Sequence, residues 1–312
     1  MAAYTVQMTG TTEVAPAVLA ALGQSFGLAA QQNLVDQLSI RQFANGDANK
    51  LNFTFGKILD IPAGTPTALL EYEDPASVAL AGSTATFSAV EHGLVVTRTS
   101  LADVISGGQL SVQAASVVGR SAAQFKNTYA ASVLAAGTNT FFAGAGTNAG
   151  LAIGDVMTPQ LMNRAYNALS KAGATKDADG YFRAILHPDV ILDLKNATGA
   201  GSWSDVFKYA DPTTVMRGEV GRAFGFKVIE STYVAAADQT GAGTVDVYKS
   251  IFMGADALGQ GVNVEPQLRI TSSDKLARFV NYGWYACLVM AIIAQEQVFV
   301  VSTSSSVGAN AA

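Results

Sequence analysis

The sequence has little charge, one cysteine and two histidines, and each shortage argues against a class of protein. Charged residues make up 14% of the 312 residues, against about 25% in ordinary soluble proteins. Cys287 has no second cysteine with which to form an internal disulfide. Two histidines and one cysteine do not readily build a transition-metal centre. We therefore expect neither a disulfide scaffold nor such a metal site.

No apolar run is long enough to span a membrane as a helix, which needs about 20 mostly apolar residues. The best run, 283–294, is followed directly by Gln295, Glu296 and Gln297. A secretory signal begins with a positive region, whereas the first Lys or Arg is Arg41. With 49% hydrophobic residues and few charges, the chain is expected to be soluble and to bury surface against other chains. The net charge of −5 argues against tight binding to nucleic acid.

The chain also lacks short motifs with an established catalytic mechanism. Walker A, HExxH, CxxC and GxSxG are absent. Gly144, Gly146 and Ala149 fit a loose dinucleotide-binding pattern, but the next predicted helix begins only near residue 158, so we interpret them as a Gly-rich loop. His187 is predicted to cap a helix or pack beneath it, and His92 to lie at an exposed strand edge. We expect no catalytic, cofactor-binding or metal-binding residues, and no enzyme.

Two β-rich segments predict a long two-stranded arm over residues 51–99. Apolar and polar residues alternate in 51–59, which is the period of a strand, and 86–99 is rich in β-branched residues. Residues 60–85 between them contain three prolines and no Lys or Arg. A lone hairpin is marginal in water, so the arm is expected to rest on another subunit. The expected intersubunit side chains are Phe53, Phe55, Leu69, Leu70, Tyr72 and Phe87.

A long helix is predicted from residue 109 to residue 136, with Gly107 and Gly108 marking its start and Gly137 its end. At 1.5 Å per residue it would be about 40 Å long. One apolar stripe follows the helical period, and its members are Leu110, Ala114, Val118, Ala122, Phe125, Tyr129 and Val133. The helix is therefore expected to act as a strut.

Residues 150–233 alternate between helix and strand patterns and predict a small α/β unit. Thr158 and Pro159 are placed as N-cap and first residue of one helix, and Pro188 opens another after a buried strand at 180–186. Further strands follow, and 302–312 is expected to be a loose tail. In "RGEVGRAFGFKVIES", 217–231, the glycines indicate turns and Gly225 the entry to a strand. The predicted fold class is α+β.

Residues 185–231 resemble the A domain of tailed-phage major capsid proteins of the Hong Kong 97-type fold, and are most similar to the N-four-type coat subfamily. The motif has a His-Pro-Asp helix start, a Trp and a Tyr, and a Gly-Glu-Val-Gly turn that leads into Gly-Phe-x-Val-x-Glu-Ser. The matching residues are His187, Pro188, Asp189, Trp203, Tyr209, Gly218, Glu219, Gly221, Gly225, Phe226 and Glu230.

The resemblance implies an order of parts along the whole chain: an N-terminal arm (1–50), an extended loop (51–99), a P domain with a spine helix (100–149 and 262–301), an A domain (150–261) and a flexible tail (302–312). It also implies pentamers and hexamers that form an icosahedral head around double-stranded DNA. Scaffold, portal and decoration proteins are possible partners, and the implied location is the virion capsid, assembled in the host cytoplasm. It implies no cofactor.

Two departures from the family pattern limit what the resemblance implies. Residues 59–97 contain no Lys, so a Lys–Asn cross-link of the extended loop is not expected. The chain starts almost at the arm, which favours a separate scaffold or none over a built-in scaffolding segment. The alternatives are a nanocompartment shell protein of the same fold, an α/β enzyme that uses residues 150–235, and a virion decoration protein.

Overall fold

A computed structural model of the chain gives the fold. It describes residues 38, 40–42, 51–58, 68, 77–80, 82–106, 109–144, 146–197, 221–234, 236–237, 240–242, 245–272, 274, 276 and 278–307. The predictions for most of the N-terminal arm fall outside these residues, as do those for Leu69, Leu70, Tyr72, Trp203, Tyr209, Gly218 and Glu219.

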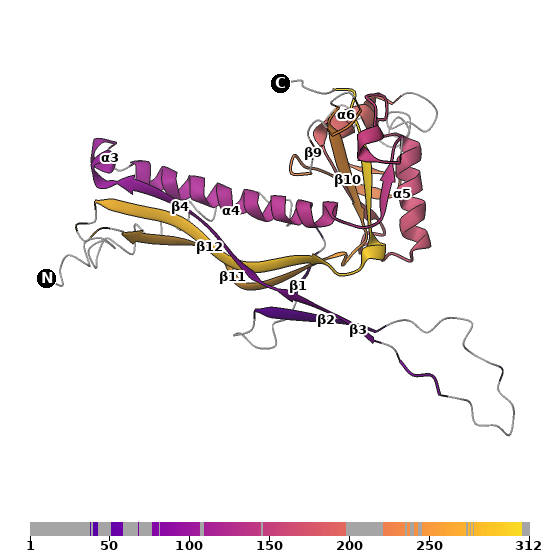
Figure 1. The fold of residues 1–312 in the computed structure, drawn as a ribbon, viewed down its shortest axis with the longest axis horizontal. Coiled ribbons are helices and arrows are strands. Elements are labelled where there is room, and N and C mark those ends of the chain that lie inside the picture. The colour runs from indigo at the N-terminus through magenta and orange to yellow at the C-terminus, as the bar shows by residue number, and fades with distance from the viewer. Residues whose placement is uncertain are drawn as a thin grey trace.

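The described residues form an elongated part, built on a sheet and one long helix, and a second part at one end of it (Figure 1). The elongated part has four strands in the order β1-β11-β12-β4. Their bounds are Ile40–Gln42 for β1, Leu258–Ser272 for β11, Phe279–Ile292 for β12 and Val90–Thr99 for β4. The pairs β11–β12 and β12–β4 are antiparallel, and β1 is parallel to β11.

The long helix α4, Gln109–Ala135, lies along one face of this sheet (Figure 1). Ala115, Val118 and Ala122 are buried against a core that includes Trp284 and Leu288 of β12. Small side chains on this face let the helix backbone approach the sheet closely. The predicted helix and its apolar stripe are therefore confirmed.

The second part is a seven-stranded sheet in the order β5-β13-β10-β6-β8-β7, with β9 paired to β10. The strands are β5 (Thr140–Phe142), β6 (Phe182–Leu186), β7 (Arg222–Ala223), β8 (Phe226–Glu230), β9 (Ala236–Ala237), β10 (Val247–Met253) and β13 (Val298–Thr303). The helices are α5 (Pro159–Lys171) and α6 (Pro188–Asn196), and two short 3-10 turns are η2 (Asn148–Gly150) and η3 (Gln295–Gln297). The parallel pair β6–β8 is joined through α6, so the predicted α/β unit is present.

Both predicted helix starts are confirmed by their hydrogen bonds. The hydroxyl oxygen of Thr158 accepts from the backbone N–H of Leu161 at 3.3 Å, with Pro159 in the first turn. Nδ1 of His187 accepts from the backbone N–H of Asp189 at 3.3 Å, with Pro188 in the first turn. Each cap satisfies a donor that the helix itself cannot.

The prediction of a single two-stranded arm over 51–99 is wrong in its second half. Strands β2 (Asn52–Ile58) and β3 (Gly82–Ser88) form the hairpin, but β4 then pairs with β12 over its whole length. The switch occurs at Ala89, which is buried and donates its N–H to Leu51 at 2.7 Å. At this residue the chain passes from the hairpin into the larger sheet.

His92 differs from its prediction for the same reason. Its ring centroid lies 4.6 Å from that of Phe125 and 5.6 Å from that of Tyr129, both on α4. Because β4 is an edge strand, the predicted edge position is correct, but the side chain is half-buried under the helix rather than exposed.

The predicted loose tail from residue 302 is wrong for its first residues. Strand β13 continues to Thr303, and Ser302 to Ser305 are buried. The backbone N–H of Ser306 donates to the Asp193 carboxylate at 3.0 Å, which fastens this segment to α6. The expected boundaries between the A domain and the P domain, at 149/150 and 261/262, also differ from the division into two sheets. Strands β5 and β13 belong to the seven-stranded sheet, and β11 already begins at Leu258.

The stretch at 217–231 forms a tight turn in its described half. Phe224 and Gly225 have φ values of 52° and 81° and connect β7 to β8. Positive φ at both central positions suits the right-handed twist of a hairpin. A Cβ added to Gly225 would lie 2.5 Å from Cε2 of Tyr166. The predicted entry to a strand at Gly225 is therefore confirmed, while 217–220 lie outside the described residues.

Gly225→Ala is expected to lower the free energy of unfolding by about 2–4 kcal/mol, because left-handed strain and overpacking against Tyr166 add together. Gly180→Ala is the matched control. Gly180 has a φ of 80° but open space around an added Cβ, so only about 1–2 kcal/mol of strain is expected. Urea unfolding of both variants measures the difference, and equal losses would contradict the close approach of Tyr166.

Candidate assembly surface

Large apolar side chains are exposed at the free end of the elongated part. The short helix α3, Ser100–Ile105, begins at an N-cap in which the hydroxyl oxygen of Thr99 accepts from the N–H of Ala102 at 3.3 Å. Leu101, Val104 and Ile105 are 68%, 78% and 78% exposed. Their spacing of three and four residues places them on one face of the helix. None of the described residues of α3 is buried.

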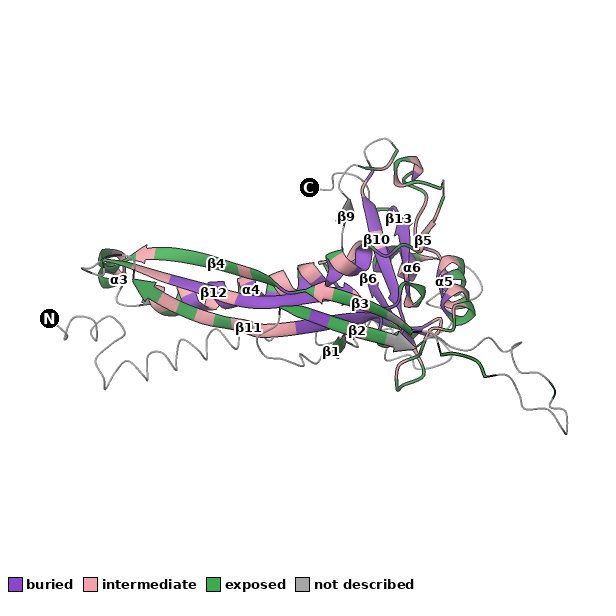
Figure 2. Cartoon of the chain, turned by 60° about the horizontal axis from the view of Figure 1, so that its bottom comes forward, coloured by how far each residue is buried: buried purple, intermediate pink, exposed green. Residues whose placement is uncertain are grey.

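The connection between β11 and β12 adds to this apolar end. Ser100 donates its N–H to the carbonyl of Arg278 at 2.7 Å, which holds the start of α3 beside that connection. Leu276 is 76% exposed, and Phe279 is also exposed. We call Leu101, Val104, Ile105, Leu276 and Phe279 the apolar tip. Figure 2 shows this end of the molecule largely in the colour of exposed residues.

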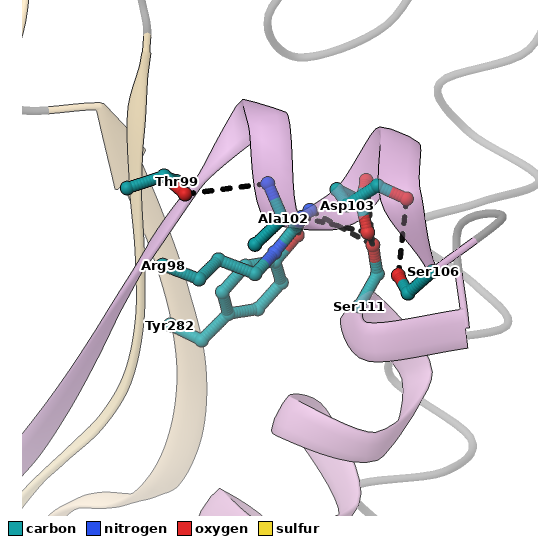
Figure 3. Close-up of polar contacts among 7 residues, drawn as sticks. All are labelled: Arg98, Thr99, Ala102, Asp103, Ser106, Ser111 and Tyr282. Atoms are coloured by element: carbon teal, nitrogen blue, oxygen red, sulfur yellow. Dashed lines mark hydrogen bonds and ion pairs between the residues drawn. The ribbon is translucent and has the colours of Figure 1, made fainter.

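A cluster of polar contacts fixes α3 in this orientation (Figure 3). Nη1 of Arg98 lies 2.7 Å from Oδ1 of Asp103. Its Nη2 donates to the hydroxyls of Ser111 and Tyr282, each at 2.8 Å. Ser111 in turn donates to Asp103 at 3.1 Å. We call Arg98, Asp103, Ser111 and Tyr282 the Arg98 clamp; it joins β4, α3, α4 and β12.

The electrostatics of the clamp favour a permanent charge on Arg98. Its side chain is 13% exposed, and burial alone would lower its pKa. Hydrogen bonds to Tyr282 and Asp103 outweigh that effect, so the pKa of Arg98 is raised above its ordinary value. The guanidinium carbon also lies 5.0 Å from the ring centroid of Tyr282. The apolar face of α3 is thus held outward by half-buried contacts. An exposed apolar face of this kind marks an interaction site.

The hairpin packs on the opposite face of the sheet from α4. Phe53 of β2 is 1% exposed and packs with Ala89, Cys287 and Val289. A Cβ added to Gly261 would lie 2.6 Å from its ring, so a glycine is needed beneath it. The prediction that Phe53 contacts another subunit is therefore wrong, because its own chain already covers it. Phe55 and Phe87 are half-buried, and their role between subunits stays a prediction.

The described motif residues of 185–231 lie in or beside the seven-stranded sheet. His187, Pro188 and Asp189 start α6, and the Tyr248 hydroxyl donates to Asp189 at 2.8 Å. Burial and this hydrogen bond raise the pKa of Tyr248 above its ordinary value. His187 Nδ1 lies 3.1 Å from the Asp189 carboxylate. The contacts of His187 are those of a cap and a packed ring.

The structure brings the two described halves of the motif together. Leu186 pairs with Glu230 in the parallel register, and the N–H of Ser231 donates to the carbonyl of Leu186 at 3.0 Å. Phe226 is fully buried in the core of this part, while Gly221 precedes β7 and Glu230 is exposed. Among the described residues, no three His, Cys, Asp or Glu side chains are placed to hold a metal ion. No helix in the same set is long and apolar enough to cross a membrane.

Sequence reasoning missed the apolar tip and the Arg98 clamp. The segment "SLADVI" has apolar residues at helical spacing, and this was the one signal that could have indicated an apolar helix face. Whether that face points inward or outward depends on Tyr282, which is 184 residues from Arg98. No local pattern contains that information.

The arrangement of a long helix on an elongated sheet with a compact α/β part at one end is that of Hong Kong 97-type capsid subunits. Three solved structures share it. The head of Helicobacter pylori bacteriophage KHP40 has a TM-score of 0.64 and 12% identity, covering 85% of this chain and 88% of that one. The Cyanophage Pam1 capsid has a TM-score of 0.63 and 15% identity, and the match covers 86% of this chain and 88% of that one. The Ralstonia phage GP4 capsid has a TM-score of 0.62 and 12% identity, and the match covers 86% of each chain.

A family model described as phage capsid protein matches residues 92–301, about two thirds of the chain. The chain therefore belongs to the phage capsid protein family, and it is a structural subunit of a capsid shell. The family match does not favour the nanocompartment alternative. In a search by sequence, no curated protein matches the chain.

Proposed function

We propose that the chain is the major capsid protein of a tailed phage with double-stranded DNA, of the N-four-type coat subfamily. In this proposal it tiles an icosahedral head as pentamers and hexamers. The observation that carries the proposal is the apolar tip, whose α3 residues are held outward by a half-buried ion pair, on a chain with only 14% charged residues. Exposed apolar surface of this kind marks an interaction site, and in this proposal other copies of the chain cover it.

The two parts of the subunit would have different roles in the shell. The seven-stranded part corresponds to the A domain and would surround the axis of each ring. The elongated part corresponds to the P domain, and its apolar tip lies at the far end from the A domain (Figure 1). Contacts around a ring are heterologous and close on themselves, whereas the tip would contact copies in neighbouring rings. The hairpin would begin the extended loop that reaches a neighbour.

The proposed partners are first of all other copies of the chain. The shell would enclose double-stranded DNA without sequence-specific contacts, because a net charge of −5 does not neutralise phosphates. Scaffold, portal and decoration proteins are further proposed partners, and assembly would take place in the host cytoplasm.

The experiment that tests this proposal is sedimentation velocity on the purified chain, with negative-stain microscopy of each fast-sedimenting species. Rings of five and six copies, or closed shells, are the expected products. The same measurement is made after coexpression with a scaffold protein from the same virus, because a separate scaffold is one of the proposed partners. A chain that stays monomeric under both conditions would contradict the proposal.

A further inference from the structure

One edge of the elongated sheet lacks the features that normally prevent an edge strand from pairing with another chain. Strand β4 ends the order β1-β11-β12-β4, and no described strand pairs with its other side. It has ten residues and pairs with β12 without a register shift. It contains no Pro and no Lys. Natural edges are protected by short strands, by charges, by Pro or by bulges, and β4 has none of these along its centre.

The charges of β4 are turned away from the open edge. Arg98 is held in the Arg98 clamp beneath α4, and Glu91 accepts a hydrogen bond from the Tyr285 hydroxyl at 2.8 Å. Between them lie Leu94, Val95 and Val96, which are 44%, 62% and 37% exposed. Consecutive residues of a strand point to opposite faces. The edge is therefore apolar on both faces at its centre.

We propose that β4 pairs with β4 of a second copy of this chain, antiparallel, about a two-fold axis at Val95. This inference rests on the proposed function and names the partner of one edge. The edge runs directly into α3, since β4 ends at Thr99 and α3 begins at Ser100, so it is continuous with the apolar tip. Strand β1, Ile40–Gln42, lies at the opposite edge of the sheet, and among the described residues no segment of the chain pairs with the open side of β4.

The facing side chains of β4 and the spacing of the two α4 helices are both compatible with this self-pairing. A pairing centred on Val95 places Leu94 of one copy opposite Val96 of the other. No carboxylate faces another carboxylate in this register. Helix α4 packs over β12, where Trp284 Nε1 donates to Ser121 at 3.4 Å. Across the junction the strand order would be β12-β4-β4-β12, so three strand spacings would separate the two α4 helices. At about 4.8 Å per spacing, the distance is about 14 Å. Packed helices need only about 8–10 Å, so the two α4 helices would not clash.

The single cysteine makes a direct test possible, because Cys287 is buried. In assembled particles of Val95→Cys, the two new thiols would lie opposite each other and form a disulfide-linked dimer under mild oxidation. Thr97→Cys is the matched control on the same face and strand. In the pairing centred on Val95, the cysteines at position 97 of the two copies would be four residues apart along the strands. At about 3.3 Å per residue this is about 13 Å, which is beyond the reach of a disulfide. We expect about tenfold more dimer for Val95→Cys on non-reducing gels.

The outcomes separate this inference from the proposed function. Particles that form normally but show no excess of Val95→Cys dimer would overturn the edge pairing and leave the capsid function intact. Failure of the unmodified chain to form particles would count against the proposed function itself. Val95→Lys is a second variant, at an exposed position where folding is not at risk. It is expected to reduce particle yield, and an unchanged yield would contradict the pairing.

Discussion

Replacing Val104 and Ile105 together with lysine is expected to weaken assembly strongly while the subunit stays folded. Both side chains are 78% exposed, so folding loses little contact. Lysine is a good helix former, and a positive charge is favourable in the last turn of a helix. In an interface, however, two apolar contacts worth about 1.5–3 kcal/mol each would be replaced by charges that must lose their water.

The measured result would be a rise on the order of a hundredfold or more in the subunit concentration needed for assembly, since each 1.4 kcal/mol is about tenfold. The matched control is Val104→Leu with Ile105→Leu, which keeps the apolar area and is expected to assemble. Sedimentation velocity gives the assembled fraction, and urea unfolding shows that both variants are folded. Normal particles from the lysine variant would show that the apolar tip is not an interface.

Arg98→Ala is expected to have a large effect on stability and on assembly together. It removes the partner of Asp103 and the donor to Ser111 and Tyr282. Asp103 is 27% exposed, so the loss in free energy of unfolding should be about 2–3 kcal/mol, below the range for fully buried pairs. Without this anchor α3 would leave its place, and assembly would fail although every apolar residue of the tip is still present.

The control for this second prediction is Arg98→Lys, which keeps the charge but cannot reach three partners with a planar fork. It should recover only part of the stability. Hydrogen exchange at the amides of 100–106 reports on α3 directly, and faster exchange is expected in Arg98→Ala. If exchange and assembly were both unchanged, the clamp would not be what orients the apolar tip.

Features set by local pattern were predictable from the sequence. The stripe that contains Val118 and Ala122 predicted α4, because helix period depends only on neighbours three and four residues away. The caps at Thr158 and His187 followed from a polar or imidazole side chain before a proline. The motif in 185–231 predicted the capsid fold, and the pairing of Leu186 with Glu230 shows why its two halves occur together.

Features set by distant contacts were not predictable. Residues 82–99 form two strands in two different sheets, and the break between them lies at Ala89, which packs with Phe53, a residue about 36 positions away. Ser302 and Thr303 have the composition of a loose tail, yet β10 covers them with a full ladder. Phe53 looked like an arm residue because the sequence does not show that Gly261 leaves space for its ring.

The measurement that tests the central claim most directly is a cryo-electron microscopy reconstruction of the assembled particle. The account predicts that Leu101, Val104 and Ile105 of each subunit are covered by a neighbouring copy, with α3 in the orientation set by Arg98. A shell in which these three side chains face solvent would contradict the account, whatever the symmetry of the particle.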